Sequence, residues 1–268
     1  MKLKIGLAQM DTVLGRGEEN RRRFQELLEE LAGEADLVLF PETWNLGFYP
    51  QKVSQLAEGE GETTKSFVAG LARRHRVNIC AGSIAEGEDG KLYNTSYVFD
   101  RQGELIGCYR KIHLFTHGKE HHHFSAGSRP GLFTAEGITW GQLICYDIRF
   151  PELARTLALA GAQVLLIPAQ WPYARLHHWR TLLMARAIEN QLYVIGVNSC
   201  GTMVGGRKAC GHSLAVDPWG EIMAEAGEGE ETLLVELDLA RVEEVRREFG
   251  VFTDRRPQLY ALEEDTFL

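Results

Sequence analysis

Three residues that could carry out acyl transfer stand directly after apolar runs that predict buried strands. They are Glu42 after Leu37–Phe40 and Pro41, Lys111 after Glu104–Arg110, and Cys145 after Ile138–Ile144. In α/β proteins, pockets lie beyond the carboxyl ends of strands. The three side chains could therefore converge on one site.

These residue types suit nucleophilic catalysis on a carbonyl carbon. Cysteine attacks as its thiolate, which a nearby base or cation must generate. The Glu42 carboxylate could take the thiol proton and later activate water. The Lys111 ammonium could hold the negative charge of a tetrahedral intermediate, with a backbone N–H after the nucleophile as a second donor. No Gly-x-Ser-x-Gly elbow is present, which argues against an ordinary serine hydrolase.

Each of the three residues also has a structural interpretation. An isolated cysteine after a strand is usually a small core side chain. A glutamate at a strand end is usually solvated or caps a helix, and a lysine there usually lies at the surface. Placement alone therefore favours the structural interpretation.

The elements that must position these residues alternate between short apolar runs and amphipathic runs. Helices are predicted over Asn20–Ala32, Lys65–His75, Pro151–Gly161, Trp179–Asn190 and Leu239–Phe249, and further strands over Leu3–Ala8, Val77–Ile84, Tyr93–Phe99, Val164–Ile167, Tyr193–Val197 and Thr232–Leu237. Asp100–Gly103 and Pro218–Gly220 read as hairpin turns. The economical layout is one domain over residues 1–268, with two mixed sheets packed face to face and helices outside.

Composition limits the classes of function. The chain has 268 residues, 44% of them hydrophobic, and a formal net charge of −8. This charge argues against a general nucleic-acid binder, because phosphate binding needs a basic face. The first nine residues read as a strand and not as a signal peptide, and no apolar run is long enough to span a bilayer. Five scattered cysteines without a CxxC motif indicate free thiols in a reducing cytoplasm.

Three local sequences change the weight of the two interpretations. Phe40-Pro41-Glu42-Thr43-Trp44, Tyr109-Arg110-Lys111-Ile112-His113-Leu114 and the stretch Ile144–Glu152 (ICYDIRFPE) resemble, in order and spacing, the signature blocks of the nitrilase superfamily of carbon–nitrogen hydrolases. Ala185–Gln191, Gly211–Ser213 and Asp217–Glu221 resemble further family segments. The resemblance covers nearly the whole chain.

The resemblance implies a four-layer αββα sandwich, assembled as a homodimer or a higher oligomer, with the tail from about residue 250 to 268 at the dimer interface. It implies no metal and no organic cofactor. By motif match, Glu42 is the general base, Lys111 stabilises the oxyanion and Cys145 is the nucleophile. Glu120 matches the second glutamate of the family, which would orient Lys111 and touch the amide. The backbone N–H of Tyr146 would complete the oxyanion hole.

The resemblance also points to a class of substrate. The run Cys145–Glu152 looks like the omega-amidase and deaminated-glutathione amidase branches. The stretches Gln170–Trp179 and Glu120–His123 resemble the bacterial omega-amidase branch. That branch acts on omega-amides of 2-oxo dicarboxylates such as 2-oxoglutaramate. Deaminated glutathione, another aliphatic amide or a nitrile is the alternative substrate.

A substrate carboxylate needs a donor, and the planar fork of arginine suits it best. Arg175, in the loop after Val164–Ile167, is the candidate, with a surface arginine as the alternative. Arg149 is interpreted as structural, paired with Glu152 or Asp147 behind the cysteine. Tyr49, Phe48 and Trp171 are expected to wall the pocket, although aromatic residues are more often core.

Two rival functions remain to be weighed. A metal-dependent hydrolase would use His121, His122 and His123, or Cys200, Cys210 and His212. Consecutive histidines do not all point at one ion, and no HExxH spacing exists. An inactive binding module would be expected to lack Glu42, Lys111 or Cys145, and all three are present.

Overall fold

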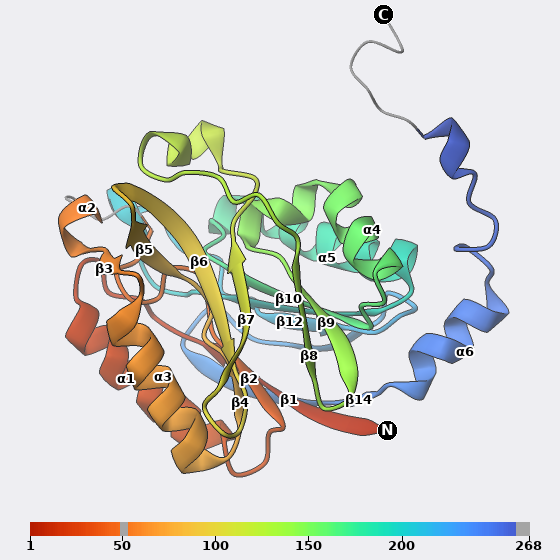
Figure 1. Ribbon diagram of the computed structural model, residues 1–268, viewed down its shortest axis with the longest axis horizontal. Helices are drawn as coiled ribbons and strands as arrows, with labels where there is room; N and C mark the ends of the chain where they lie inside the picture. Colours follow the sequence, from red (N-terminus) through yellow and green to blue (C-terminus); the bar gives the residue numbers. More distant parts are fainter. Residues whose placement is uncertain (49–52, 261–268) are drawn as a thin grey trace, which may run out of the picture.

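The first of two sheets holds the amino-terminal half of the chain (Figure 1). The protein is seen here as a computed structural model that describes residues 1–48 and 53–260. The strands of this sheet are β1 (Lys2–Gln9), β2 (Leu37–Leu39), β3 (Glu58–Gly59), β4 (Asn78–Cys80), β5 (Ile84–Glu88), β6 (Lys91–Phe99), β7 (Leu105–Arg110) and β14 (Glu231–Asp238). Their order is β14-β1-β2-β4-β6-β5-β3, and β7 pairs with β6. The sheet is mixed. Strands β1, β2 and β4 run parallel to one another, whereas β14 pairs antiparallel with β1 and β6 pairs antiparallel with β4.

The second sheet is built from the carboxyl-terminal half. Its strands are β8 (Gly131–Ala135), β9 (Ile138–Gln142), β10 (Val164–Ala169), β11 (Tyr193–Asn198), β12 (Leu214–Val216) and β13 (Ile222–Glu225), in the order β13-β12-β11-β10-β9-β8. The central strands β9, β10 and β11 are parallel. Strands β10 and β11 are buried along their whole length, as strands covered on both faces must be.

Helices cover the outer face of each sheet. α1 (Gly17–Leu31) and α3 (Glu62–His75) pack on the first sheet, and α4 (Pro151–Leu159) and α5 (Leu176–Asn190) pack on the second. α2 (Val53–Leu56) is a single turn, and α6 (Ala240–Glu248) follows β14. Side chains such as Ile5, Leu39, Trp140, Leu166 and Ile195 form a third core between the sheets. The layers are therefore αββα, and the predicted fold class is confirmed.

Three sequence-based assignments of strands were wrong, missing or incomplete. The predicted strand Val77–Ile84 is two strands, β4 and β5, because the chain turns at Gly82 with a φ of +62°. A side chain there would place its Cβ 2.0 Å from the Pro41 carbonyl oxygen. Strand β8 was not predicted. The run Ile138–Ile144 is a strand only as far as Gln142.

The fold brings the ends of β2, β7 and β9 to one side of the molecule. β2 and β7 belong to the first sheet and β9 to the second, so a site at these ends draws residues from both sheets. Two short 3-10 turns, η1 (Thr116–Gly118) and η2 (Glu120–His122), follow β7. In the described part of the chain, no helix is both long enough and apolar enough to cross a membrane.

Candidate active site

Cys145 opens the 3-10 turn η3 (Cys145–Arg149) that connects β9 to α4. Its φ of +46° lies in the left-handed region, which costs a residue with a side chain about 1–2 kcal/mol. Such strain persists only where the surroundings hold the backbone in place. The cysteine is therefore presented on a sharp, restrained turn.

Asp147, buried within the same turn, supplies that restraint. One carboxylate oxygen, Oδ2, accepts hydrogen bonds from the Ile144 N–H at 2.9 Å and the Tyr109 hydroxyl at 2.8 Å. The other, Oδ1, accepts one from the His113 N–H at 3.0 Å and lies 2.8 Å from His113 Nδ1. Asp147 thus ties the turn at Cys145 to the segment that carries Lys111.

Lys111 lies between two carboxylates. Its Nζ is 2.7 Å from Glu42 Oε1 and 3.0 Å from Glu120, and none of the three side chains has exposed surface. Burial alone would lower the pKa of Lys111, but the charges of Glu120 and Glu42 raise it above its ordinary value. Lys111 therefore stays protonated although its side chain is fully buried.

The two carboxylates are held by further donors. Glu42 Oε2 accepts the Gln170 backbone N–H at 2.9 Å, and the Gln170 side-chain amide donates to the Glu42 carbonyl. Glu120 Oε2 accepts the Phe115 N–H at 2.6 Å. Asn94 donates to both carboxylates. Hydrogen bonds to the ionised form offset part of the cost of burying each charge.

The Cys145 thiol is held in its protonated form. Burial raises its pKa well above the ordinary value, and the charge of Glu42 and a hydrogen bond to Glu42 raise it further, while Lys111 opposes them. A thiolate therefore forms only as its proton leaves for a base. Glu42 is the hydrogen-bonded carboxylate in position to receive it.

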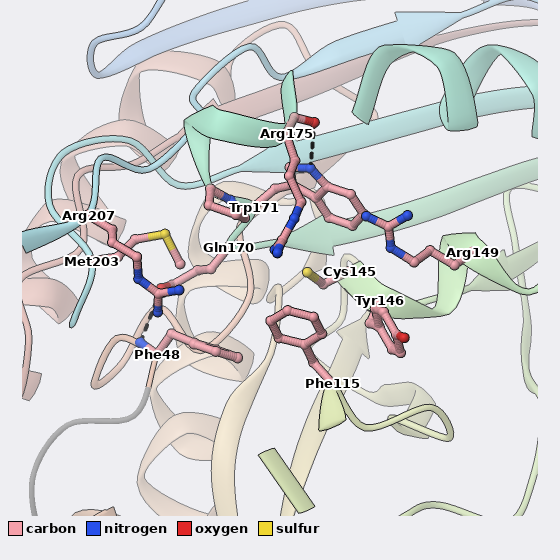
Figure 2. Close-up of a pocket in the computed structure, with 11 residues that line it drawn as sticks. Phe48, Phe115, Cys145, Tyr146, Arg149, Gln170, Trp171, Arg175, Met203 and Arg207 are labelled. Carbon is pink, nitrogen blue, oxygen red and sulfur yellow. Dashed lines mark hydrogen bonds between the residues drawn. The ribbon is translucent and has the colours of Figure 1, made fainter. Parts of the chain in front are cut away.

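A cavity opens directly above the thiol (Figure 2). The empty space in it and at its open mouth is about 400 Å³. Its lining is Phe48, Phe115, Cys145, Tyr146, Arg149, Gln170, Trp171, Pro172, Arg175, Met203 and Arg207. Trp171, Arg175 and Tyr146, predicted for the pocket or the oxyanion hole, thus stand around the nucleophile. Tyr49 lies outside the described residues.

The interpretation of Arg149 as a structural residue paired with Glu152 or Asp147 was wrong. Its guanidinium lies over the Trp171 ring at 4.7 Å and faces the cavity. Asp147 is occupied by the hydrogen bonds described above. In the described part of the chain, no carboxylate lies within ion-pair distance of Arg149 or Arg175. Burial and the charge of Arg175 both lower the pKa of Arg149, so the two guanidinium groups repel each other.

Sequence reasoning missed two further residues of the site. Arg207 reaches the cavity from the loop after β11, where no local pattern distinguishes it from a surface arginine. Asn94 lies inside β6 and reads as an ordinary polar strand residue. Only the stretch Tyr93-Asn94-Thr95-Ser96, polar within a strand that the fold buries, could have drawn attention to it.

The residues proposed for the metal alternative are not gathered. Among residues 1–48 and 53–260, no group of three or more His, Cys, Asp or Glu side chains is arranged to hold a metal ion. All five cysteines are free thiols, and only Cys108 is exposed.

Known proteins resemble this chain in sequence and in fold. The sequence model of the Carbon-nitrogen hydrolase family matches residues 4–247. The 2-oxoglutaramate amidase of Bacillus subtilis (strain 168) is 42% identical over 260 residues, which cover 97% of this chain and all of the relative. A CN-hydrolase superfamily protein of Xanthomonas campestris, solved with an arsenic adduct in its active site, superposes with a TM-score of 0.90 at 32% identity, covering 96% of this chain and 98% of that one.

A solved amidase also carries a covalent adduct. It is a variant of the amidase from Nesterenkonia sp. AN1, with the acetamide moiety of fluoroacetamide added at its active site cysteine. Its TM-score is 0.86 at 27% identity, and the match covers 96% of this chain and 95% of that one. Because the family model matches most of its length and its fold is that of solved members, the chain belongs to the carbon–nitrogen hydrolase family.

Proposed function

We propose that this carbon–nitrogen hydrolase converts the omega-amide of a small dicarboxylate, of the 2-oxoglutaramate type, to the acid and ammonia through a thioester on Cys145. One observation carries the proposal. Cys145 lines a cavity together with three arginines, beside the buried group of Lys111, Glu42 and Glu120, and none of the lining residues in the described part of the chain is acidic. The thiol, the two carboxylates and the ammonium group suit acyl transfer. The three arginines suit an acyl chain that ends in a carboxylate.

In the first half-reaction, Glu42 takes the thiol proton as the Cys145 sulfur attacks the amide carbonyl carbon. The carbonyl oxygen becomes an oxyanion, stabilised by the Lys111 ammonium and the Tyr146 N–H. Glu42 then passes its proton to the amide nitrogen. The carbon–nitrogen bond breaks, ammonia leaves, and the acyl group stays on sulfur as a thioester.

In the second half-reaction, Glu42 takes a proton from water as the water oxygen attacks the thioester carbon. The same donors stabilise the second oxyanion. The carbon–sulfur bond then breaks, the acid leaves, and the sulfur regains the proton from Glu42. Glu120 is proposed to keep Lys111 in position and to touch the amide nitrogen.

The acyl chain is proposed to bind through its far carboxylate. Arg175 and Arg149 repel each other and have no described carboxylate as partner, so an anion between them would relieve the repulsion. Trp171 packs against the Arg149 guanidinium and gives the cavity a flat wall. Deaminated glutathione, or an uncharged aliphatic amide, is the second candidate for the substrate.

The relatives support this proposal. The Bacillus relative is named for 2-oxoglutaramate and is similar over its whole length. A variant of the Nesterenkonia amidase carries the acetamide moiety of fluoroacetamide on its active site cysteine, so the cysteine of that amidase is a nucleophile, the role that we propose for Cys145.

We further propose a homodimer in a reducing, cytoplasmic environment. Residues 249–260 extend from the body of the sandwich (Figure 1) and expose the apolar side chains of Phe249, Leu259 and Tyr260. A surface of this kind usually meets another protein. Five free thiols fit a reducing compartment.

A panel of substrates tests the proposed function. Ammonia release is measured with 2-oxoglutaramate, deaminated glutathione, a simple aliphatic amide and a nitrile. The highest kcat/KM is expected for 2-oxoglutaramate, and Cys145→Ala should reduce every rate to background while leaving the fold intact. A higher kcat/KM for deaminated glutathione or the aliphatic amide would show that the proposed substrate is wrong. Undiminished turnover by Cys145→Ala would refute the mechanism.

A further inference from the structure

Asn94 bridges the two carboxylates that flank Lys111. It lies on β6 and is 1% exposed. Its side-chain nitrogen Nδ2 is 2.8 Å from Glu42 Oε1 and 3.1 Å from Glu120 Oε1. One amide group therefore gives a hydrogen bond to each carboxylate, at the same two oxygens that face the ammonium group of Lys111.

The amide is oriented entirely by these two carboxylates. Its own oxygen, Oδ1, is buried and accepts no hydrogen bond from any residue in the described part of the chain. The opposite orientation would place that oxygen against two carboxylate oxygens. Only the observed orientation supplies donors to both carboxylates, and a hydrogen bond to an ionised carboxylate is stronger than one to its protonated form.

The charges around Asn94 make this donation matter. The groups that face Glu42 are Lys111, Glu120 and the Cys145 thiol, and Arg149 lies on the cavity side of Cys145. Two carboxylates thus share one ammonium group in a buried site. Like charges in such a site favour protonation of one carboxylate, and a protonated Glu42 could not accept the thiol proton.

We propose that Asn94 is a positioning residue that keeps Glu42 and Glu120 ionised together on either side of Lys111, so that Glu42 remains a base at neutral pH. The inference rests on the proposed amidase function, in which Glu42 takes the proton of Cys145. Asn94 thus adds to the Glu–Lys–Cys arrangement a neutral group whose two N–H donors stabilise the excess negative charge.

The pKa of Glu120 lies above its ordinary value, so the ionised form of this carboxylate needs stabilisation. Burial raises the pKa of Glu120 and the charge of Lys111 lowers it, while the charge of Glu42 raises it again. A hydrogen bond to the ionised form favours that form. Removing Asn94 should therefore raise the pH at which the first of the two carboxylates binds a proton.

The test compares Asn94→Leu with a matched control, Asn78→Leu. Asn78 is a buried amide on β4 whose Nδ2 also makes two hydrogen bonds, to the Asp36 carbonyl and to Glu136, but it touches no group of the site. For Asn94→Leu, kcat should fall roughly 10- to 100-fold with little change in KM, and the acid limb of the kcat/KM profile should move up by about one pH unit. Asn78→Leu should lose thermal stability without moving that limb. An Asn94→Leu profile that coincides with the wild-type profile would overturn the inference.

A second variant covers the case in which Asn94→Leu does not fold. Asn94→Asp keeps the size of the side chain but adds a third carboxylate, which should raise the acid limb further. An unshifted limb in this variant would overturn the inference equally.

Alkylation separates this test from the test of the proposed function. The pH dependence of Cys145 modification by iodoacetamide needs no substrate. It is followed on the Cys145 peptide by mass spectrometry, because Cys108 is exposed and would react as well. If the wild type releases no ammonia from any amide, the proposed function fails. The Asn94 inference is then tested by the pH dependence of Cys145 alkylation alone. A shift of its acid limb in the two Asn94 variants supports the inference, and an unshifted limb overturns it.

Discussion

Lys111 has no exposed side-chain surface and carries its charge between Glu42 and Glu120. Burying such a group is costly, and its hydrogen-bonded partners offset the cost only when all of them are in place. The arrangement is therefore explained better by chemistry than by stability. In the proposed mechanism, it holds the ammonium group that stabilises the oxyanion of the tetrahedral intermediate.

Arg149 and Arg175 should determine the preference for an anionic acyl chain. Each substitution, Arg149→Gln and Arg175→Gln, removes a charge-assisted hydrogen bond of about 1.5–3 kcal/mol. KM for 2-oxoglutaramate should therefore rise about 10- to 100-fold, while KM for an uncharged aliphatic amide changes little. Steady-state kinetics on both substrates checks this. An equal rise for the two amides would show that neither arginine reads the carboxylate.

The raised pKa of Cys145 predicts a loss of stability at alkaline pH. In the unfolded chain the thiol ionises near its ordinary pKa of 9.0, whereas the folded protein retains the proton to higher pH. The folded state therefore binds more protons above that pH, and its stability falls as the pH rises. Cys145→Ser removes this contribution.

Urea unfolding checks this second prediction. Between about pH 8 and about pH 10.5, the wild type should lose up to about 1–2 kcal/mol more stability than Cys145→Ser. The other buried thiols contribute equally to both proteins and cancel in the difference. Parallel stability curves for the two proteins would contradict a raised pKa at Cys145.

At the residue scale, the strand ends in the sequence predicted that Glu42, Lys111 and Cys145 could converge, and the structure brings them together. Glu120 came from the family resemblance alone. Asn94 and the cavity-facing position of Arg149 were beyond local patterns, because each depends on partners far along the chain. Arg149, for example, meets Trp171 only after α4 and β10 have packed.

At the scale of elements, the turn between β4 and β5 holds the segment that carries Glu42. The Ser83 N–H donates to the Pro41 carbonyl, and Ser83 accepts hydrogen bonds from the backbone N–H groups of Thr43 and Trp44. Gly82 makes this close approach possible, since its φ is +62° and a Cβ there would collide with the Pro41 backbone. The turn therefore positions the general base proposed here.

Gly82→Ala should reduce both stability and activity. The strained φ and the collision together should cost more than about 2 kcal/mol in urea unfolding. Displacement of Pro41 should lower kcat/KM by at least roughly tenfold, because small errors in the position of a base are costly. Gly90→Ala is the control, with a similar φ of +73° and no atom within 4 Å of the added Cβ. It should cost about 1 kcal/mol and leave kcat/KM unchanged; a similar loss of activity in both variants would contradict the account.

The sequence predicted most helices and strands, because α1 and α3 show one apolar face and β10 and β11 are continuous apolar runs. It failed where tertiary contacts decide the backbone. Gly82 divides the run Val77–Ile84 because Pro41 lies against it. The left-handed turn at Cys145 is held by Asp147 through Tyr109 and His113, which lie more than thirty residues earlier. Strand β8 alternates between buried and exposed residues for only five positions, a weak signal.

At the scale of the whole molecule, two sheets must pack face to face before a site exists at all. Glu42 and Lys111 follow strands of the first sheet, and Cys145 follows a strand of the second. The core between the sheets, with Trp140, Leu166 and Ile195 among its residues, therefore sets the distance between the Cys145 thiol and the Glu42 carboxylate. A substitution in that core should therefore change the rate of the reaction, although it alters no residue to which we assign a catalytic role.

The segment after α6 should carry the contact between two copies of the chain. Leu259 and Tyr260 are 64% and 52% exposed. Light scattering should give twice the chain mass of 30.1 kDa for the wild type, and the double variant Leu259→Glu with Tyr260→Glu should shift the equilibrium toward monomer. Leu132→Glu, which changes an exposed leucine on β8, is the control and should remain dimeric. A monomeric wild type would contradict the proposed assembly.

The thioester on Cys145 is the central claim, and trapping it is the most direct test. The enzyme is mixed with 2-oxoglutaramate, quenched with acid in the steady state and measured by intact-protein mass spectrometry. The wild type should gain the mass of the acyl group, that is, of the substrate less ammonia, and fragmentation should place it on the peptide that contains Cys145, with no adduct on Cys145→Ala. Acid and ammonia formed at full rate without any adduct on Cys145, or an adduct on another residue, would contradict the account.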